Sequence, residues 1–532
     1  MKVLGLSLLL SLVMLGGLSA QNGSKQVDLK EITDGKFRQV SAIGDMRSLP
    51  DGEHYTAMNG DRNMIIKYSY RTGHPVDTLF NAKTARECTF KDFEGYQISS
   101  TGHRILVWRD SESIYRRSSK AVVYDYDVRR NFVKPLTEST SKQMIPTFSP
   151  DGRMCAYVRD NNIWIKKFDF DTETQVTKDG EINKVLNGIT DWVYEEEFSV
   201  TNLMAWSPDN EYLAFVKTNE TEVPTYSMQK FDNLYPDFYT YKYPKAGQKN
   251  SKITLHSYSV ASKDIKELKL PVNEETYIPR IVFTTNADQL AVMTLNRTQN
   301  VFNMYYANPK SGVFRLVLRE ENKSYVDSEY LTSIRFSASG FTYLSEQNGY
   351  AHIYLYSPTG VMQRQVTKGN WDVTRLIGID EVTKTVYYES AEESPLRRAV
   401  YKIDAKGVKT KLTKQAGTNS AEFSANFAYY VNKYSNANTP MQITVYEAKK
   451  GTALRVLQDN NTLKKKLAEY GYTKKEFFTV QTASGYELNA WMVKPVNFDE
   501  NKKYPVLMVQ YSGPASQEVT DSYGFDWEHY LA

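Results

Sequence analysis

Three consecutive carboxylates lie between aromatic residues in the run Asp191-Trp-Val-Tyr-Glu-Glu-Glu-Phe198. Like charges packed together repel and raise one another's pKa, so such a run needs either full solvation or a cation. A solvated acidic helix face is one interpretation. The other is a site for a positively charged group small enough to meet two neighbouring carboxylates. The free α-amine of a peptide fits this second interpretation, because it carries one charge and three donors.

Two further residues have side chains suited to binding a peptide. Arg116, in Ser113-Ile-Tyr-Arg-Arg-Ser118, could contact a carbonyl oxygen, although such an Arg-Arg pair is usually a surface feature of a strand edge. Tyr511 follows the apolar run 504–510, which is typical of a strand covered on both faces in an α/β sheet. Functional groups gather beyond the carboxyl ends of such strands. The Tyr511 hydroxyl is therefore a candidate donor to a developing oxyanion, and a structural role in a turn is the alternative.

The elements that must position these residues repeat along the chain. The clearest copy of the repeat is Thr147-Phe-Ser-Pro-Asp-Gly152 followed by two short strands, and Ala205-Trp-Ser-Pro-Asp-Asn210 is a close second copy. In this turn Pro pre-sets φ and Gly takes the positive φ that closes it. Weaker copies near residues 47, 98, 282, 335, 378 and 422 bring the number of starts to eight. Units of this length pack radially, so we predict an all-β eight-bladed β-propeller over residues 41–455 rather than a β-sandwich.

One interval between repeats is longer than the others. Between Glu222 and Tyr258 lies a stretch rich in Tyr and Pro, with its centre at residues 234–245. We predict that it is an insertion that leaves the blade. Exposed aromatic residues on such an arm usually bind something, but a plain surface loop is equally compatible with the sequence.

The repeat stops near residue 455. The pattern then predicts a short helix over 461–470 with Gly471 just past its end, alternating strands at 477–481 and 488–493, and the apolar strand 504–510. We therefore expect residues 456–532 to contain a linker helix and the first strands of an incomplete α/β domain.

Composition excludes several classes of protein. The 532 residues carry 66 Lys and Arg against 62 Asp and Glu, a net charge of +4, which argues against a dedicated nucleic-acid binder. Two cysteines, Cys88 and Cys155, cannot form a disulfide scaffold; two free thiols are favoured over one bridge. No spacing of ligands indicates a metal site, and no cofactor is expected.

The first twenty residues have the outline of a secretory signal peptide. Lys2 is followed by an apolar run that ends in small residues at Ser19 and Ala20. An uncleaved anchor is the alternative. We therefore expect a periplasmic or secreted protein whose mature chain begins after Ala20.

At these residues the sequence resembles the dipeptidyl peptidase IV family of serine exopeptidases. The resemblance covers essentially the whole chain, and its most specific marks are Asp191-Trp-Val-Tyr-Glu-Glu-Glu197, Thr221-Glu-Val-Pro224 and Tyr511-Ser-Gly-Pro-Ala-Ser-Gln517. It implies an eight-bladed propeller over an α/β-hydrolase domain, with the segment 21–40 packed on that hydrolase domain. It also implies removal of N-terminal Xaa-Pro or Xaa-Ala dipeptides from peptides with a free N-terminus.

The resemblance assigns roles to individual residues. It implies that Glu196 and Glu197 hold the substrate's α-ammonium, that Glu195 is a neighbour rather than a ligand, and that Arg116 binds the carbonyl of the second substrate residue. Tyr511 would donate to the oxyanion. The arm near Tyr235 to Lys245 looks like the family's dimerisation extension, so a homodimer is expected.

The chain departs from the family in one respect. The family's nucleophile lies in a Gly-x-Ser-x-Gly elbow followed by Asp and then His, and the 532 residues contain no such elbow. The first interpretation is the N-terminal part of a dipeptidyl peptidase, inactive alone because it lacks the Ser-Asp-His triad. The second is a non-catalytic propeller that binds peptide N-termini or acts as a scaffold.

Overall fold

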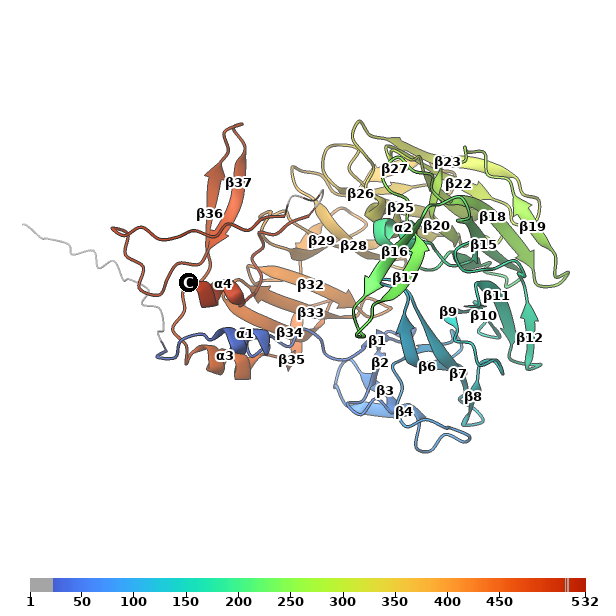
Figure 1. Ribbon diagram of the computed structural model, residues 1–532, viewed down its shortest axis with the longest axis horizontal. Coiled ribbons are helices and arrows are strands. Elements are labelled where there is room, and N and C mark those ends of the chain that lie inside the picture. The colour runs from blue at the N-terminus through green and yellow to red at the C-terminus, as the bar shows by residue number, and fades with distance from the viewer. Residues whose placement is uncertain (1–22, 512, 514–515) are drawn as a thin grey trace, which may run out of the picture.

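A computed structural model describes residues 23–511, 513 and 516–532, so the predicted signal peptide lies outside the described residues. Eight antiparallel sheets are arranged around a ring, which fills most of Figure 1. Seven of the sheets take their strands in chain order, and in the fourth sheet β13 and β14 both pair with β15. Seven of the eight predicted starts fall at the first strand of a sheet, and the start at residue 205 falls on β14 of the fourth sheet. The prediction of an eight-bladed propeller is confirmed.

The first four blades span β1 to β19. Blade 1 contains β1 (Arg47–Ser48), β2 (His54–Met58), β3 (Met64–Ser69) and β4 (Pro75–Asn81). Blade 2 contains β5 (Gly95–Ile98), β6 (Arg104–Ser113), β7 (Ser119–Asp127) and β8 (Phe132–Pro135). Blade 3 contains β9 (Met144–Phe148), β10 (Met154–Arg159), β11 (Asn162–Lys167) and β12 (Thr172–Gln175). Blade 4 contains β13 (Val185–Asn187), β14 (Met204–Trp206), β15 (Tyr212–Asn219), β18 (Lys252–Ser259) and β19 (Ile265–Leu268).

The last four blades span β20 to β35. Blade 5 contains β20 (Tyr277–Phe283), β21 (Leu290–Leu295), β22 (Val301–Ala307) and β23 (Phe314–Glu321). Blade 6 contains β24 (Arg335–Ser337), β25 (Gly340–Ser345), β26 (His352–Tyr356) and β27 (Met362–Gln365), preceded by a 3-10 helix, η1 (Ser328–Ser333). Blade 7 contains β28 (Val373–Asp380), β29 (Thr385–Ser390), β30 (Ala399–Ile403) and β31 (Lys409–Lys411). Blade 8 contains β32 (Thr418–Phe423), β33 (Tyr429–Asn436), β34 (Thr439–Glu447) and β35 (Thr452–Gln458).

The repeated turn works as its residues predict. In blade 3, the Ser149 hydroxyl donates to Asp151 Oδ1 at 2.6 Å, the amide of Gly152 donates to the carbonyl of Ser149 at 2.8 Å, and Gly152 has a φ of +71°. All six residues of the following strand, β10, are buried. The turn therefore leads directly into a buried strand inside blade 3, whose side chains are apolar except for Arg159 at its end.

The ring closes where blade 8 meets blade 1. The Tyr429 hydroxyl donates to Glu53 Oε2 at 3.0 Å, and the rings of Tyr70 and Tyr429 stack at 5.6 Å. The amide of Ala425 donates to the Ser48 hydroxyl at 2.9 Å. Side chains from both blades form one apolar cluster here, so packing joins the first blade to the last.

Blade 4 carries two insertions, and both bear on the site. A helix, α2 (Trp192–Phe198), lies between β13 and β14. The stretch rich in Tyr forms a separate antiparallel ribbon of β16 (Thr225–Lys230) and β17 (Asp237–Lys242), called the arm below. The prediction of an insertion that leaves the blade is confirmed.

The chain on either side of the propeller packs together at the left of Figure 1. Helix α1 (Leu29–Thr33) precedes blade 1, and α3 (Asn461–Leu467) follows blade 8. Phe37 is buried against Tyr470 and Phe525, with ring centroids 5.0 and 4.6 Å apart. The segment that enters the propeller is thus held by the segment that leaves it, together with α4 (Trp527–Leu531).

The predictions for residues 456–532 are confirmed in part. The helix forms but ends at Leu467, and the two alternating strands are β36 (Glu476–Gln481) and β37 (Glu487–Met492). The prediction of a buried strand over 504–510 is wrong, because this run forms no strand and the side chains of residues 506–509 are mainly exposed. Among the described strands, β36 and β37 pair only with each other, so no neighbouring strand adjoins this run.

Two further observations concern the cysteines and the membrane. Cys88 and Cys155 are free thiols, as favoured above. Within the described residues, no helix is long and apolar enough to cross a bilayer.

Candidate functional site

The acidic run forms α2, and a buried carboxylate caps its first turn. The Asp191 side chain accepts from the amide of Tyr194 at 3.0 Å and from the Ser251 hydroxyl. Burial raises the pKa of the Asp191 carboxyl, and these hydrogen bonds oppose that rise. Ser199, in the left-handed region at φ 55°, ends the helix. The helix is therefore fixed at both ends within seven residues.

Aromatic residues fix the rotation of α2 about its axis. Tyr194 and Phe198 are buried on the side that faces blade 5, and the Phe198 ring lies 5.1 Å from that of Tyr277. The Tyr194 hydroxyl accepts from the amide of Ile278 at 2.9 Å. Because this side is pinned to blade 5, the side chains of Glu195, Glu196 and Glu197 point in three different directions.

Glu195 points into the protein and binds backbone. Its Oε1 accepts from the amides of Arg117 and Ser118, the latter at 2.8 Å. The Arg117 guanidinium in turn donates to the carbonyl of Glu195 at 2.9 Å. Glu195 thereby ties the turn between β6 and β7 of blade 2 to the helix of blade 4.

That turn carries Arg116 to the next glutamate. Arg116 Nη2 lies 2.7 Å from Glu196 Oε1, and Arg117 Nη1 lies 4.0 Å from Glu196 Oε2. The Glu196 side chain is 25% exposed and the Arg116 side chain 69% exposed, so solvent reaches the ion pair. Glu197 is exposed. Three of the predicted site residues, Arg116, Glu196 and Glu197, thus lie together, although Arg116 is in a turn and not on a strand edge.

The arm packs against the same turn. The Tyr239 hydroxyl donates to the carbonyl of Ile114 at 3.3 Å, and the Tyr115 ring lies 5.9 Å from that of Tyr241. Burial raises the pKa of Tyr115, and the negative groups around it act in the same direction. Residues 114–118 are therefore held by two elements, the Glu195 carboxylate and the arm.

A further carboxyl, that of Glu220, is buried beneath the site. Burial and the nearby charge of Asp191 raise its pKa to about 7, while Lys242 acts in the opposite direction. It follows β15 and precedes the arm. The sequence analysis did not identify Glu220, because a single Glu at a strand end carries no signal of burial.

Tyr511 lies apart from these residues. Tyr511 is 68% exposed, and within the described residues the ion-pair partners of Glu196 are Arg116 and Arg117, not Tyr511. The structure therefore brings together the predicted amine-binding residues but leaves the predicted oxyanion donor outside the cluster. In the described part of the chain, no group of three or more His, Cys, Asp or Glu side chains is arranged to hold a metal ion.

The arrangement has a defined chemical capacity. Two carboxylates with solvent access, next to a guanidinium with free donors, can hold a cation and an adjacent carbonyl oxygen together. The pairing of Arg116 with Glu196 means that an incoming ammonium must share or displace this contact. The sequence motif was sufficient to predict Glu196 and Glu197 as site residues. The contact of Glu195 with the turn at Arg117 and Ser118 could not be predicted, because that turn lies 77 residues away in the chain.

Comparison with known proteins places the site in context. Residues 99–441 match the family model described as the dipeptidyl peptidase IV N-terminal region. A dipeptidyl peptidase 4 of Arthroderma otae is 31% identical over 465 residues, which cover 83% of this chain and 59% of the relative. A dipeptidyl peptidase 4 of Trichophyton rubrum is 32% identical over 441 residues, covering 78% of this chain and 56% of the relative. The chain thus spans less than two thirds of these curated relatives.

A solved structure is more similar. The crystal structure of Porphyromonas gingivalis dipeptidyl peptidase 4 superimposes with a TM-score of 0.94 at 61% sequence identity. The match covers 96% of this chain and 73% of that protein.

Proposed function

The chain belongs to the dipeptidyl peptidase IV family, and on that premise we propose that it supplies the propeller and the amine-binding site of a secreted or periplasmic serine-type dipeptidyl peptidase. The substrate would be a peptide with a free N-terminus, from which an Xaa-Pro or Xaa-Ala dipeptide is removed. The secretory location rests on the pattern of residues 1–20 alone.

One observation carries the proposal. Glu196 and Glu197 are adjacent on α2 with solvent access, and the Arg116 guanidinium lies against Glu196. A substrate ammonium held between the two carboxylates stands at a fixed distance from any nucleophile that acts on the second peptide bond. A blocked amine offers no positive charge to exchange for the contact between Arg116 and Glu196, so the site favours peptides with a free N-terminus.

Arg116 is suited to the second contact. Once an ammonium takes over the Glu196 carboxylate, the guanidinium keeps five donors and enough exposure to turn toward a carbonyl oxygen. Its loss should therefore weaken peptide binding less than the loss of either carboxylate, because removing Arg116 also removes a competitor for Glu196.

Calorimetric titration with a tripeptide Ala-Pro-Ala tests the proposal directly. We expect binding that is lost on N-acetylation and lost in Glu196→Ala and Glu197→Ala. Glu211→Ala, an exposed carboxylate in the turn between β14 and β15 of the same blade, is the matched control and should bind as the parent does. Equal affinity for the free and acetylated peptides would contradict the proposal.

The alternative is a propeller that binds peptide N-termini or acts as a scaffold without catalysis. The 532 residues hold no Gly-x-Ser-x-Gly motif, so we expect no hydrolysis of a Gly-Pro arylamide by this chain. A fluorophosphonate probe applied to the native cells separates the two functions. A labelled species that contains this sequence would support the peptidase, and an unlabelled species that binds Ala-Pro-Ala would support the binding module.

The arm supports a homodimer. Its exposed side chains include Phe231, Leu234, Tyr235 and Phe238, of which Leu234 is 93% exposed. Isolated two-stranded ribbons with large apolar side chains gain stability when a second surface covers them. We expect Tyr235→Ala combined with Phe238→Ala to shift the sedimentation coefficient from dimer to monomer, and an unchanged coefficient would contradict the proposed interface.

A further inference from the structure

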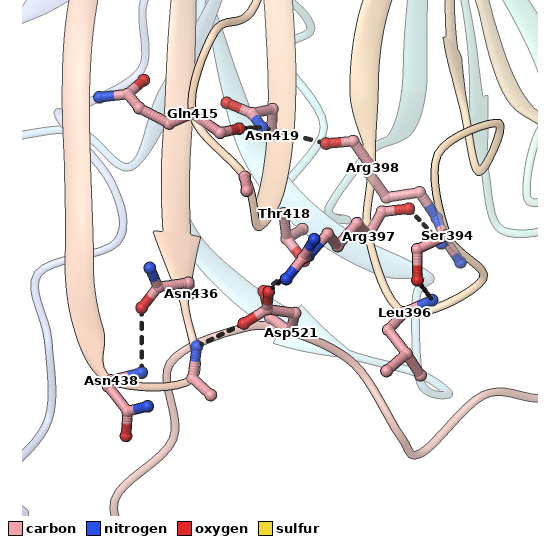
Figure 2. Close-up of polar contacts among 12 residues, drawn as sticks. Ser394, Leu396, Arg397, Arg398, Gln415, Thr418, Asn419, Asn436, Asn438 and Asp521 are labelled. Carbon is pink, nitrogen blue, oxygen red and sulfur yellow. Dashed lines mark hydrogen bonds and ion pairs between the residues drawn. The ribbon is translucent and has the colours of Figure 1, made fainter. Parts of the chain in front are cut away.

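Asp521 connects the C-terminal part of the chain to the propeller through all of its polar atoms. Its Oδ2 accepts from Arg397 Nε at 2.8 Å and its Oδ1 from the amide of Ala437 at 2.9 Å. Its own amide donates to the carbonyl of Leu396 at 2.8 Å, and its carbonyl accepts from the Thr418 hydroxyl at 3.0 Å. Figure 2 shows the carboxylate between Arg397 and the turn that carries Asn436 and Asn438.

The partners of Asp521 come from two different blades. Leu396 and Arg397 lie in the loop between β29 and β30 of blade 7, whereas Thr418 and Ala437 belong to blade 8. A second contact joins the same two blades next to Asp521. The backbone amide and the side-chain amide of Asn419 both donate to the carbonyl of Arg398 at 3.0 Å. Asp521 is buried, whereas the side chain of Arg397 is partly exposed, so solvent reaches the ion pair only from the arginine side.

The residues around Asp521 extend this attachment in both directions. The Gln517 side chain donates to the carbonyl of Pro395 and accepts from Arg398, both at 2.6 Å. On the other side, Phe525 packs on Phe37 of the segment that enters the propeller. Residues 516–526, the connecting segment, are therefore attached to blades 7 and 8 and to the N-terminal segment. Tyr511 lies ten residues before Asp521 in the chain.

We propose that Asp521 is a positioning residue, which fixes the place of the chain that carries Tyr511 relative to the amine-binding residues on the propeller. The inference rests on the proposed function, because it gives Tyr511 a role only if a substrate spans the two. The amine-binding residues lie on blades 2 and 4, and Asp521 is bonded to blades 7 and 8 of the same closed ring. Because contacts between blades 8 and 1 close the ring, blades 7 and 8 have a set place relative to blades 2 and 4. The contacts of Asp521 with blades 7 and 8 would then determine how far Tyr511 lies from α2.

A distance measurement tests this directly. Nitroxide labels are placed at Ile182→Cys, in the loop before β13 of blade 4, and at Val509→Cys, two residues before Tyr511. The background is Cys88→Ser, and the distance between the labels is read by pulsed dipolar spectroscopy. The two native side chains are 72% and 70% exposed. We expect one narrow distance distribution in the parent protein and a broad one in Asp521→Ala. We also expect amide exchange across residues 516–521 to become about tenfold faster, as befits the loss of a charge-assisted hydrogen bond.

Control variants separate positioning from folding. Asp526→Ala removes the carboxylate that caps α4 in the same segment but makes no contact with the propeller among the described hydrogen bonds, so the distribution should stay narrow. Asp521→Asn keeps one acceptor for the amide of Ala437 and should broaden the distribution less than Asp521→Ala. If Asp521→Ala does not fold, the distance distributions of Asp521→Asn and Arg397→Gln test the inference instead. Each of these variants removes the ion pair, so each should broaden the distribution. An unchanged width in these variants, or a broad distribution in the parent protein, would overturn the inference.

The same samples separate this inference from the proposed function. Asp521→Ala should bind Ala-Pro-Ala with the affinity of the parent, because Arg116, Glu196 and Glu197 do not contact it. If the parent does not bind the peptide, the proposed function fails while the distances still show whether Asp521 positions the segment. If the peptide binds but Asp521→Ala leaves the distances unchanged, only the positioning role fails.

Discussion

Replacing Glu195 should weaken peptide binding although Glu195 does not face the peptide. Its Oε1 accepts from the amides of Arg117 and Ser118, and these bonds hold the turn that carries Arg116. A hydrogen bond to a charged group contributes about 1.5–3 kcal/mol. Glu195→Ala removes the acceptor for both amides. Ser118 is buried, so its amide cannot simply bond to solvent instead. The turn must then find other partners or become mobile.

The magnitude follows from the number of bonds lost. If the free energy of one such bond is needed to reorder the turn when a peptide binds, the affinity falls by about tenfold to a hundredfold, since 1.4 kcal/mol corresponds to a factor of ten. Glu195→Gln separates charge from geometry, because its amide oxygen still accepts. Within the described residues Glu195 Oε2 is buried without a hydrogen-bond partner, so loss of the charge removes a cost as well as a benefit. We therefore expect Glu195→Gln to bind close to the parent.

Calorimetry with Ala-Pro-Ala measures the effect, and amide exchange over residues 114–118 shows its origin. The expected result is weaker binding together with faster exchange in Glu195→Ala, and neither change in Glu195→Gln. Weaker binding of equal size in both variants would show that the charge of Glu195 acts on the peptide directly. Unchanged binding in Glu195→Ala, with the turn exchanging faster, would refute the claim that the order of this turn matters.

Three further predictions concern buried groups. Because burial raises the pKa of Glu220 from 4.5 to about 7, the native state holds this proton more tightly than the unfolded chain does. The protonated Glu220 therefore stabilises the folded state fully below pH 4.5, and this stabilisation is lost as the pH rises through 7, by up to about 3 kcal/mol. Glu220→Gln cannot ionise, so it should raise Tm at pH 8 and leave Tm unchanged at pH 4. A Tm gain of equal size at both pH values would contradict this assignment. Asp191→Ala should lower the free energy of unfolding in urea by about 1–2 kcal/mol through loss of the α2 cap, and an unchanged urea midpoint would argue against it. Burial raises the pKa of the Cys155 thiol, so iodoacetamide should leave Cys155 unmodified in the native protein and modify it in urea, as mass spectrometry would show.

The sequence predicted those parts of the fold whose causes are local. Eight copies of one turn determine eight blades, since the Pro, Asp and Gly of Ser149 to Gly152 act within a few residues of one another. The run 504–510 was misjudged for the opposite reason. A strand covered on both faces depends on neighbouring strands, and the apolar pattern of the run carries no information on whether these lie beside it. The contacts of Asp521 with Arg397 and Ala437 span 124 and 84 residues. The residues next to Asp521 in the sequence do not predict contacts over such separations.

The three glutamates show most clearly where sequence pattern ends and structure begins. Residue type is identical at 195, 196 and 197, but a helix turns each side chain by about 100° from the last, so a helix pinned by Tyr194 and Phe198 must send them to different surroundings. The first meets buried amides, the second an arginine and the third solvent. A buried carboxylate with backbone partners builds the site, and only a carboxylate that solvent reaches can exchange its partner for a substrate. The different roles of the three glutamates therefore come from the rotation of α2 about its axis. A change elsewhere that rotates this helix should exchange their roles, although the three residues themselves stay the same.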